Sequence, residues 1–193
     1  MIIKTPWPEG ARGLYYQDRI MANIVLTGFM ATGKSTVGRA LAKALGLSFV
    51  DMDSLIEKEA GLSVADIFKE YGEPFFRAAE VSVVRRLANG EYGTGLVVST
   101  GGGVVADPAN RAALKGWATV ICLSASVDEI LRRVGARADR PLLDVADRRE
   151  RVERLLAERA EAYIDCHLVI DTTGESVDEI AGKIIAYLRE GAR

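Results

Sequence analysis

The sequence predicts an α/β fold, a five-stranded parallel sheet with helices on both faces. Short apolar runs alternate with segments of helical periodicity, as expected for repeated strand–helix–strand units. The 193 residues contain no internal repeat or linker that would divide them into two domains. Five runs are the candidate strands: 23–27, 48–51, 96–100, 118–123 and 167–171. Ligands of such a doubly wound sheet bind outside the carboxyl ends of its strands, so we expect the functional residues there.

The segments between these runs carry residues that start and stop helices. Positions 37, 41 and 45 are apolar at helical spacing, and Gly46 can end that helix as a C-cap. Asp107-Pro108 pairs a cap residue with a first-turn proline. Capping boxes, in which an acidic residue stands three positions after a serine, begin at Ser63, Ser126 and Ser176. Helices are therefore expected after every strand.

Charge and composition exclude several classes of function. A net charge of −2 lacks the broad positive field of a protein that binds nucleic acid irrespective of sequence, so we expect no nucleic-acid partner. No run approaches the ~20 apolar residues of a membrane span. Cys122 and Cys166 lie in apolar, strand-like runs without metal-ligand spacing, which predicts buried thiols. The single histidine, His167, is expected at a core or edge position of the last strand.

The N-terminal segment differs in character from the rest of the chain. Its first twenty residues hold two prolines, two glycines and scattered charges, and they lack the apolar core of a secretory signal. We expect residues 1–21 to form a loose extension and residues 22–193 to form the single folded domain. The predicted protein is a cytoplasmic monomer.

Residues 28–36, GFMATGKST, follow the first strand and match a phosphate-binding loop (P-loop). Gly28 and Gly33 would allow positive φ and a close approach of the backbone to phosphates. Lys34 would reach the β- and γ-phosphates, and the Ser35 hydroxyl would bind Mg²⁺. The helix that follows adds the positive end of its dipole. The motif therefore predicts binding of a nucleoside triphosphate with Mg²⁺.

Two carboxylates, Asp51 and Asp53, end the second strand, where the sheet should meet the nucleotide. Side chains two positions apart on an extended segment point the same way, so both can face one site. One carboxylate near Mg²⁺ and one near an acceptor hydroxyl would serve phosphoryl transfer. The alternative is that Asp53 caps a helix starting near Leu55.

Two segments are longer than simple connections require. Residues 53–90 are almost entirely helical in pattern, whereas residues 135–147, GARADRPLLDVAD, are polar and broken by Pro141. We expect a substrate-binding insertion and a mobile lid, respectively. Within the insertion, Arg77 and Glu80 stand three positions apart. They form either a weak exposed pair or a unit in which Glu80 orients Arg77 toward a substrate carboxylate.

Glycines and arginines mark the remaining candidate positions. The three glycines at 101–103 directly follow the third strand. They form either a flexible turn or bare backbone against which another group packs. Four arginines lie in, beside or after the lid: Arg133, Arg137, Arg140 and Arg159. They are either a solvated basic face or cations that offset transition-state charge on the γ-phosphate.

Seven segments resemble, in order and spacing, the shikimate kinase family: GFMATGKSTVG, FVDMD, IEKEAG, IFKEYGEPFFRAAE, VVSTGGGVV, RPLL and RAEAY. The resemblance extends from about residue 22 to the C-terminus, and its DxD, FRxxE and GGG motifs are more specific than the P-loop alone. It implies the nucleoside monophosphate kinase fold, with strand order 2-3-1-4-5, a substrate subdomain and a closing lid. It also implies transfer of the ATP γ-phosphoryl group to the 3-hydroxyl of shikimate, with Mg²⁺, in aromatic amino-acid biosynthesis.

The resemblance assigns roles by motif position. Asp53 would hold the shikimate hydroxyls and accept the proton, while Asp51 and Ser35 would hold Mg²⁺. Lys34 and Arg140 would complete the catalytic set, with Arg140 meeting the phosphates from the lid. The shikimate pocket would also contain Arg77, Gly101, Gly102, Gly103 and Arg159. ATP would contact Gly28, Ala31, Thr32, Gly33, Lys34, Ser35, Thr36, Arg133, Arg140 and Thr172, the adenine lying near Arg133 and Thr172.

Two other interpretations stay open at this point. One is another P-loop small-molecule kinase that acts on gluconate or a nucleoside monophosphate. The other is a nucleotide-driven switch or motor, although the chain has no Asn/Thr-Lys-x-Asp motif for reading guanine. The FRxxE and GGG motifs favour shikimate. ATP turnover that depends on a small acceptor would distinguish a kinase from a motor or switch.

Overall fold

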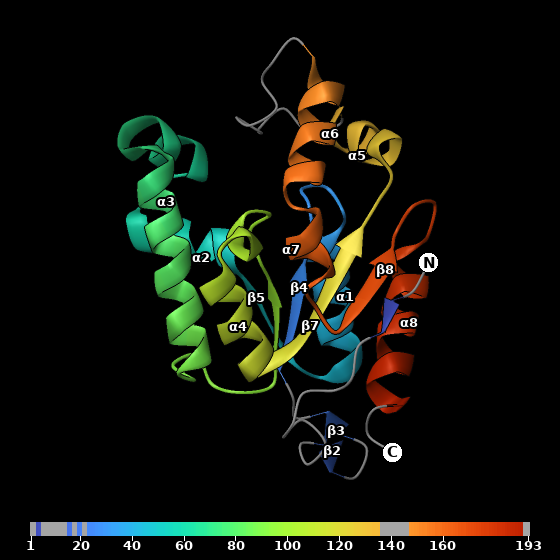
Figure 1. Ribbon diagram of the computed structural model, residues 1–193. Coiled ribbons are helices and arrows are strands. Elements are labelled where there is room, and N and C mark those ends of the chain that lie inside the picture. The colour runs from blue at the N-terminus through green and yellow to red at the C-terminus, as the bar shows by residue number, and fades with distance from the viewer. Residues whose placement is uncertain (1–2, 5–14, 17–18, 21–22, 136–146, 191–193) are drawn as a thin grey trace.

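A computed structural model describes residues 3–4, 15–16, 19–20, 23–135 and 147–190. Its sheet has five parallel strands at the centre, in the spatial order β5-β6-β4-β7-β8. They are β4 (Asn23–Thr27), β5 (Ser48–Asp51), β6 (Leu96–Ser99), β7 (Ala118–Ser124) and β8 (Leu168–Asp171). Numbered along the chain, this order is 2-3-1-4-5, and each predicted strand boundary lies within one residue of the observed one. The predicted fold class and strand order are confirmed (Figure 1).

A sixth strand, β1 (Ile3–Lys4), pairs antiparallel with the edge strand β8. We did not predict it from the sequence. An edge strand presents unpaired backbone donors and acceptors, and β1 engages those of β8 through the pairing of Ile3 with Val169. β2 (Tyr15–Tyr16) and β3 (Arg19–Ile20) form a separate two-stranded sheet. Much of the segment 1–21 lies outside the described residues, so its looseness stays a prediction.

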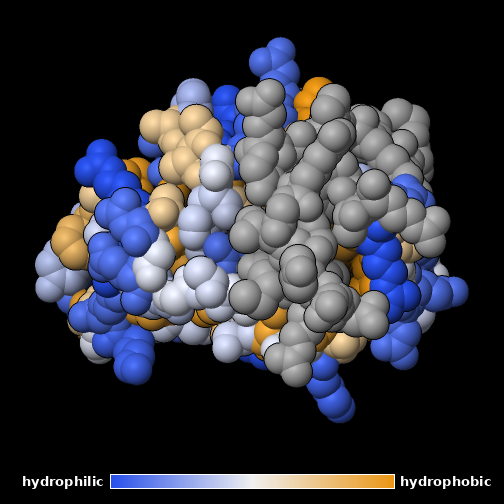
Figure 2. Space-filling model, turned by 90° about the horizontal axis from the view of Figure 1, so that it is seen from below, coloured by the Kyte–Doolittle hydropathy of each residue, from blue (hydrophilic) through white to orange (hydrophobic). Residues whose placement is uncertain are grey.

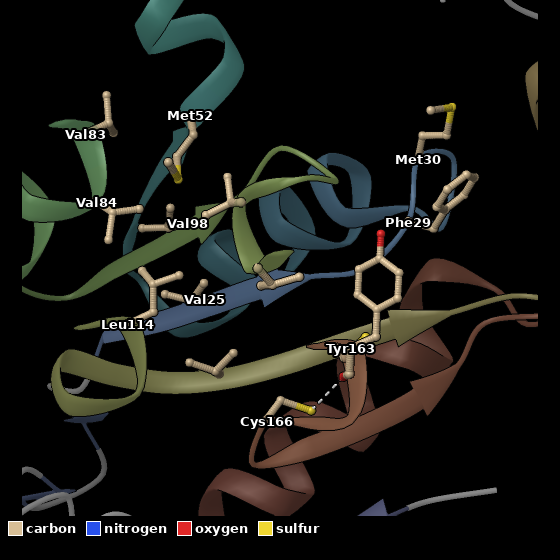
Figure 3. Close-up of a cluster of buried hydrophobic side chains, with 14 of the residues drawn as sticks. Val25, Phe29, Met30, Met52, Val83, Val84, Val98, Leu114, Tyr163 and Cys166 are labelled. Carbon is tan, nitrogen blue, oxygen red and sulfur yellow. Dashed lines mark hydrogen bonds between the residues drawn. The ribbon is translucent and has the colours of Figure 1, made fainter. Parts of the chain in front are cut away.

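The two faces of the sheet carry separate hydrophobic cores because successive strand side chains point to opposite faces. On one face, Ile24 and Leu26 pack with α1 (Lys34–Leu45) and α8 (Val177–Glu190). On the other face, Val25 and Val98 pack with Leu114 of α4 (Pro108–Trp117) and with helices that precede it in the chain (Figure 3). Burial on both faces explains why the central strands are nearly uninterrupted apolar runs.

The predicted helical segment 53–90 consists of α2 (Met52–Ala60) and α3 (Val64–Ala88). Ser63 caps α3, accepting a hydrogen bond from the Asp66 amide at 3.1 Å, as its capping box predicts. Gly72, at φ 78°, interrupts α3 two residues before Pro74, and the helix changes direction there. The insertion thereby rises beside the carboxyl ends of the strands (Figure 1).

The connections on the other side of the site are also helical. η2 (Val104–Ala106) precedes α4, whose N-cap is Asp107, as predicted. α5 (Val127–Gly135) begins after Ser126, and α6 (Arg148–Glu158) and α7 (Ala160–Ile164) follow the predicted lid. Lid residues 136–146, which include Arg137 and Arg140, lie outside the described residues. α5 and α6 stand above the carboxyl end of the sheet (Figure 1).

Both cysteines are free, buried thiols, as predicted. His167 is buried directly before β8, where its Nδ1 accepts a hydrogen bond from the Val120 amide at 2.9 Å. Burial lowers the pKa of His167, so the imidazole is neutral and structural.

No helix among the described residues combines the length and apolar character of a membrane span. The face at the amino ends of the parallel strands is mostly hydrophilic where it is coloured (Figure 2).

Candidate active site

The P-loop connects β4 to α1 in the geometry that its glycines predict. Gly28 has φ 128° and Gly33, at the N-cap of α1, has φ 97°. A Cβ on Gly28 would lie 2.1 Å from the Leu123 carbonyl oxygen of β7, so no other residue fits there. Ala31, where many P-loops carry glycine, has φ 61°. A left-handed alanine costs about 1 kcal/mol, which the surrounding loop structure must offset.

Lys34 is folded back over this loop. Its Nζ donates to the carbonyl oxygens of Gly28 and Phe29, each at 2.8 Å, and the side chain is buried. Thr32 Oγ1 also donates to the Phe29 carbonyl, at 2.8 Å. A buried ammonium at the N-terminal end of α1 creates a site for anions, and phosphate groups fit it.

Ser35 stands at the end of the loop beside two strand ends. Its Oγ donates to Asp51 Oδ2 at 2.6 Å and lies 3.2 Å from Ser99 Oγ, at the end of β6. Hydroxyl and carboxylate oxygens are ligands that Mg²⁺ prefers, usually with water and nucleotide phosphates completing its shell. The set therefore fits a metal bound mainly through the nucleotide. The described residues hold no cluster of three His, Cys, Asp or Glu side chains that would hold a metal alone.

The two aspartates reach the site differently from what we predicted. Asp51 ends β5 and caps α2, accepting from the Ser54 amide at 3.5 Å, whereas Asp53 lies in the first turn of the helix. The expectation that both sit on an extended segment was therefore wrong, and so was the alternative that Asp53 is the cap. The strand turns into a helix at Met52, so both carboxylates still line a single cavity of about 590 Å³ with the P-loop.

A second cavity, of about 340 Å³, adjoins the first. Met30, Asp53 and Gly102 line both cavities. The second cavity is otherwise enclosed mainly by the insertion and by the glycine segment, residues 101–103. Its lining includes Phe68, Phe76, Arg77, Glu80 and Arg159. Asp53 therefore lies between the P-loop, which lines the first cavity, and the charged side chains Arg77, Glu80 and Arg159, which line the second.

Arg77 and Glu80 are not a weak exposed pair. Arg77 Nη1 donates to Glu80 Oε2 at 2.6 Å, and its Nη2 donates to Glu73 Oε1 at 2.8 Å. Only 2% of the Glu80 side chain is exposed. Burial raises the pKa of Glu80 to about 7, although the Arg77 charge opposes this effect. Glu80 thus holds one edge of the Arg77 guanidinium, which lines the second cavity.

The glycine segment is bare because side chains of the site occupy the adjacent space. A Cβ on Gly103 would lie 2.2 Å from Arg77 Nη1. A Cβ on Gly101 would lie 2.6 Å from Glu80 Oε1 and 2.8 Å from Asp53 Oδ1. The interpretation in which other groups pack against bare backbone is therefore confirmed at these two glycines.

Arg133 bridges two loops of the first cavity rather than contributing to a solvated face. Its Nη1 donates to the Ala31 carbonyl at 3.2 Å and to Thr172 Oγ1 at 3.1 Å, and its Nη2 donates to the Thr172 carbonyl at 2.9 Å. Glu129 accepts from Arg133 Nε at 2.7 Å. Thr172 is fully buried, and its hydroxyl also contacts the Thr32 carbonyl at 3.2 Å. The bridge connects the P-loop to the end of β8.

Two residues near the cavities were missed by sequence reasoning. Ser99 lies beside Ser35, and the rule that ligands bind at strand ends would have found it. Tyr163 donates from its hydroxyl to the Gly102 carbonyl at 2.8 Å, and Arg159 Nη1 donates to the same oxygen at 3.3 Å. The spacing of four residues between Arg159 and Tyr163, which places both on one helical face, is the signal that was available.

Comparisons with known proteins agree with this geometry. A family model described as shikimate kinase matches residues 30–189. A shikimate kinase from Geobacter metallireducens is 46% identical over 166 residues, covering 86% of this chain and 91% of that protein. One from Thermoanaerobacter pseudethanolicus is 44% identical over 170 residues, covering 88% and 98%. The structure of shikimate kinase from Acinetobacter baumannii in complex with shikimate matches with a TM-score of 0.83 at 35% identity, over 88% of this chain and 94% of that one. The chain therefore belongs to the shikimate kinase family of ATP-dependent kinases.

Proposed function

We propose that this protein transfers the γ-phosphoryl group of ATP to the 3-hydroxyl of shikimate, with ATP in the first cavity and shikimate in the second. The observation that carries the proposal is the junction of the two cavities at Asp53. The P-loop lies on one side of this junction, and two arginines that can bind a carboxylate lie on the other.

On the nucleotide side, the P-loop amides and Lys34 bind the phosphates, and Arg133 keeps the loop beside the segment that follows β8. Ser35 and Asp51 hold Mg²⁺, which supplies positive charge to the transferring phosphoryl group when it is bound. Arg140 of the lid contacts the phosphates in this proposal. Its position lies outside the described residues.

On the acceptor side, Arg77 and Arg159 bind the shikimate carboxylate. A guanidinium presents a planar fork that matches two carboxylate oxygens, and Glu80 already orients that of Arg77. Asp53 holds the acceptor hydroxyl at the junction. It takes the hydroxyl proton as the new P–O bond forms and the bond from the γ-phosphorus to the β–γ bridging oxygen breaks, which releases ADP. Phosphoryl transfer depends mainly on positioning and electrostatic stabilisation, so the position of Asp53 carries most of its effect.

We also propose that the enzyme is cytoplasmic and monomeric. Two free, buried cysteines fit a reducing compartment. A sedimentation or size-exclusion measurement at micromolar concentration tests the monomer directly, because a dimer would double the apparent mass.

ADP release with Mg·ATP tests the reaction, comparing shikimate, gluconate, AMP and no acceptor. Release with shikimate alone, accompanied by formation of a phosphorylated product, supports the proposal. Release with gluconate or AMP instead would retain the P-loop assignment and overturn the acceptor. A parallel preparation of Lys34→Ala controls for contaminating kinases, because their activity would survive that substitution.

A further inference from the structure

We infer that Tyr163 is a positioning residue for the acceptor: its hydroxyl holds the Gly102 carbonyl so that Arg159 stays available to the substrate carboxylate. This inference rests on the proposed function, since it takes Arg159 as a ligand of shikimate. Tyr163 itself lines neither cavity.

Two side chains converge on the Gly102 carbonyl oxygen. It accepts hydrogen bonds from Tyr163 Oη at 2.8 Å and from Arg159 Nη1 at 3.3 Å. A carbonyl oxygen has two lone pairs and can accept both. The tyrosine bond is the shorter one, so it secures the oxygen even when the arginine turns its donors to another partner.

The two donors lie one helical turn apart at the start of α7. Arg159 is the N-cap of this helix, and the Tyr163 amide donates to the Arg159 carbonyl at 3.0 Å. The two side chains are thus one helical turn apart and converge on one backbone atom. If the Gly102 carbonyl moves, the Arg159 guanidinium must move with it to keep its hydrogen bond.

The tyrosine ring is held in place by packing. Tyr163 is 8% exposed and belongs to the same hydrophobic core as Val25 and Leu114. Its hydroxyl lies at the end of the ring remote from Cys166, whose Sγ donates to the Tyr163 carbonyl (Figure 3). Burial raises the pKa of Tyr163, so the hydroxyl is a neutral donor throughout the physiological range. A rigid ring with a permanent donor is suited to fixing a backbone atom.

Without the hydroxyl, Arg159 would be the remaining side-chain donor to the Gly102 carbonyl within the part of the chain that the structure describes. The Gly102 backbone is half-buried, and its carbonyl oxygen would still attract the donor that remains. The Arg159 guanidinium would therefore be drawn toward Gly102 and away from the ligand. The consequence should fall on the acceptor, because Arg159 lines the second cavity and not the first. The P-loop, which holds the nucleotide, makes no hydrogen bond to Tyr163 among the described residues.

The test is Tyr163→Phe, which keeps the ring and removes the hydroxyl. We expect the KM for shikimate to rise about 3- to 10-fold, the equivalent of one neutral hydrogen bond, with the KM for ATP and kcat within about twofold of the wild type. The matched control is Tyr187→Phe. It also removes one bond from a tyrosine hydroxyl to a backbone carbonyl, from Tyr187 Oη to the His167 carbonyl at 3.1 Å, at a residue that lines neither cavity. It should lower the melting temperature without changing the shikimate KM.

A double-mutant cycle with Arg159→Ala separates positioning from general loosening. The effect of Tyr163→Phe on kcat/KM for shikimate should shrink to less than about twofold when Arg159 is absent, because the two residues act through one oxygen. Equal effects in both backgrounds, an unchanged shikimate KM, or an equal rise in the ATP KM would overturn the inference. A wild-type enzyme that does not phosphorylate shikimate would instead overturn the proposed function.

Discussion

Gly103→Ala should displace Arg77 and weaken acceptor binding while leaving the fold intact. The added Cβ would lie 2.2 Å from Arg77 Nη1, 2.6 Å from Cζ and 2.8 Å from Nη2. A methyl group needs about 3.5 Å from neighbouring heavy atoms, so the guanidinium must move by more than about 1 Å. It is the far end of a flexible side chain that is 29% exposed, and it can move without disturbing the backbone.

The displacement has a cost that can be worked out from the contacts. Arg77 would lose its hydrogen bond to Glu80, in which Nη1 lies 2.6 Å from Oε2. The displaced guanidinium would also lose the hydrogen bond to the shikimate carboxylate that the proposed function assigns to it. A hydrogen bond to a charged group contributes about 1.5–3 kcal/mol. The dissociation constant for shikimate should therefore rise by about 10- to 150-fold.

Isothermal titration with shikimate, and separately with Mg·ATP, measures this effect. The ATP affinity and the melting temperature should stay close to those of the wild type. Gly116→Ala is the matched control, because a Cβ at this helical position of α4 meets no atom within 4 Å. An unchanged shikimate affinity in Gly103→Ala, or an equal loss of ATP affinity, would refute the reasoning.

Three further predictions concern single side chains of the site. Lys34→Ala should lower turnover by about 100-fold or more, because the phosphates lose their buried cation; near wild-type ADP release would contradict the P-loop assignment. Asp53→Asn should lower kcat by about 100-fold with ATP binding retained, and a loss of ATP affinity by titration would instead place Asp53 in the metal site. In Glu80→Gln, the pH dependence of unfolding should change. In the native protein the pKa of Glu80 is about 7, compared with an ordinary value of 4.5. Its contribution to the free energy of unfolding, at most about 3 kcal/mol, is therefore present below pH 4.5 and is lost as pH rises through 7. Urea unfolding between pH 4.5 and 8 should show the wild type losing stability relative to the variant, and parallel curves would exclude this role.

Local signals predicted most of the secondary structure because they act within a few residues. Ser63 caps α3 through the Asp66 amide three positions on, and Asp107 caps α4 through the Ala109 amide. The buried strands read as apolar runs because both of their faces are covered. β1 has no comparable signal, since a two-residue strand is defined by the partner edge it meets.

The site was predicted in its residue types but not in its contacts. The P-loop spacing identified Gly28, Gly33 and Lys34, because a phosphate cradle is made by consecutive residues. The aspartate pair was identified for a reason that proved wrong, since the backbone becomes helical between Asp51 and Asp53. Both side chains still line one cavity, which depends on how the β5–α2 junction is placed against the P-loop.

Periodicity, helix caps and motif spacing are properties of neighbouring residues, so the succession of strands and helices, the P-loop and the family could all be predicted from the chain. Three contacts of the site could not be predicted in this way: Arg77 lies against Gly103, Arg133 joins Ala31 to Thr172, and Arg159 and Tyr163 share one carbonyl oxygen. Each of these contacts joins residues at least 26 positions apart in the chain. Whether such groups meet in space depends on how the helices pack on the sheet. The conformational preferences of neighbouring residues carry no information about that packing.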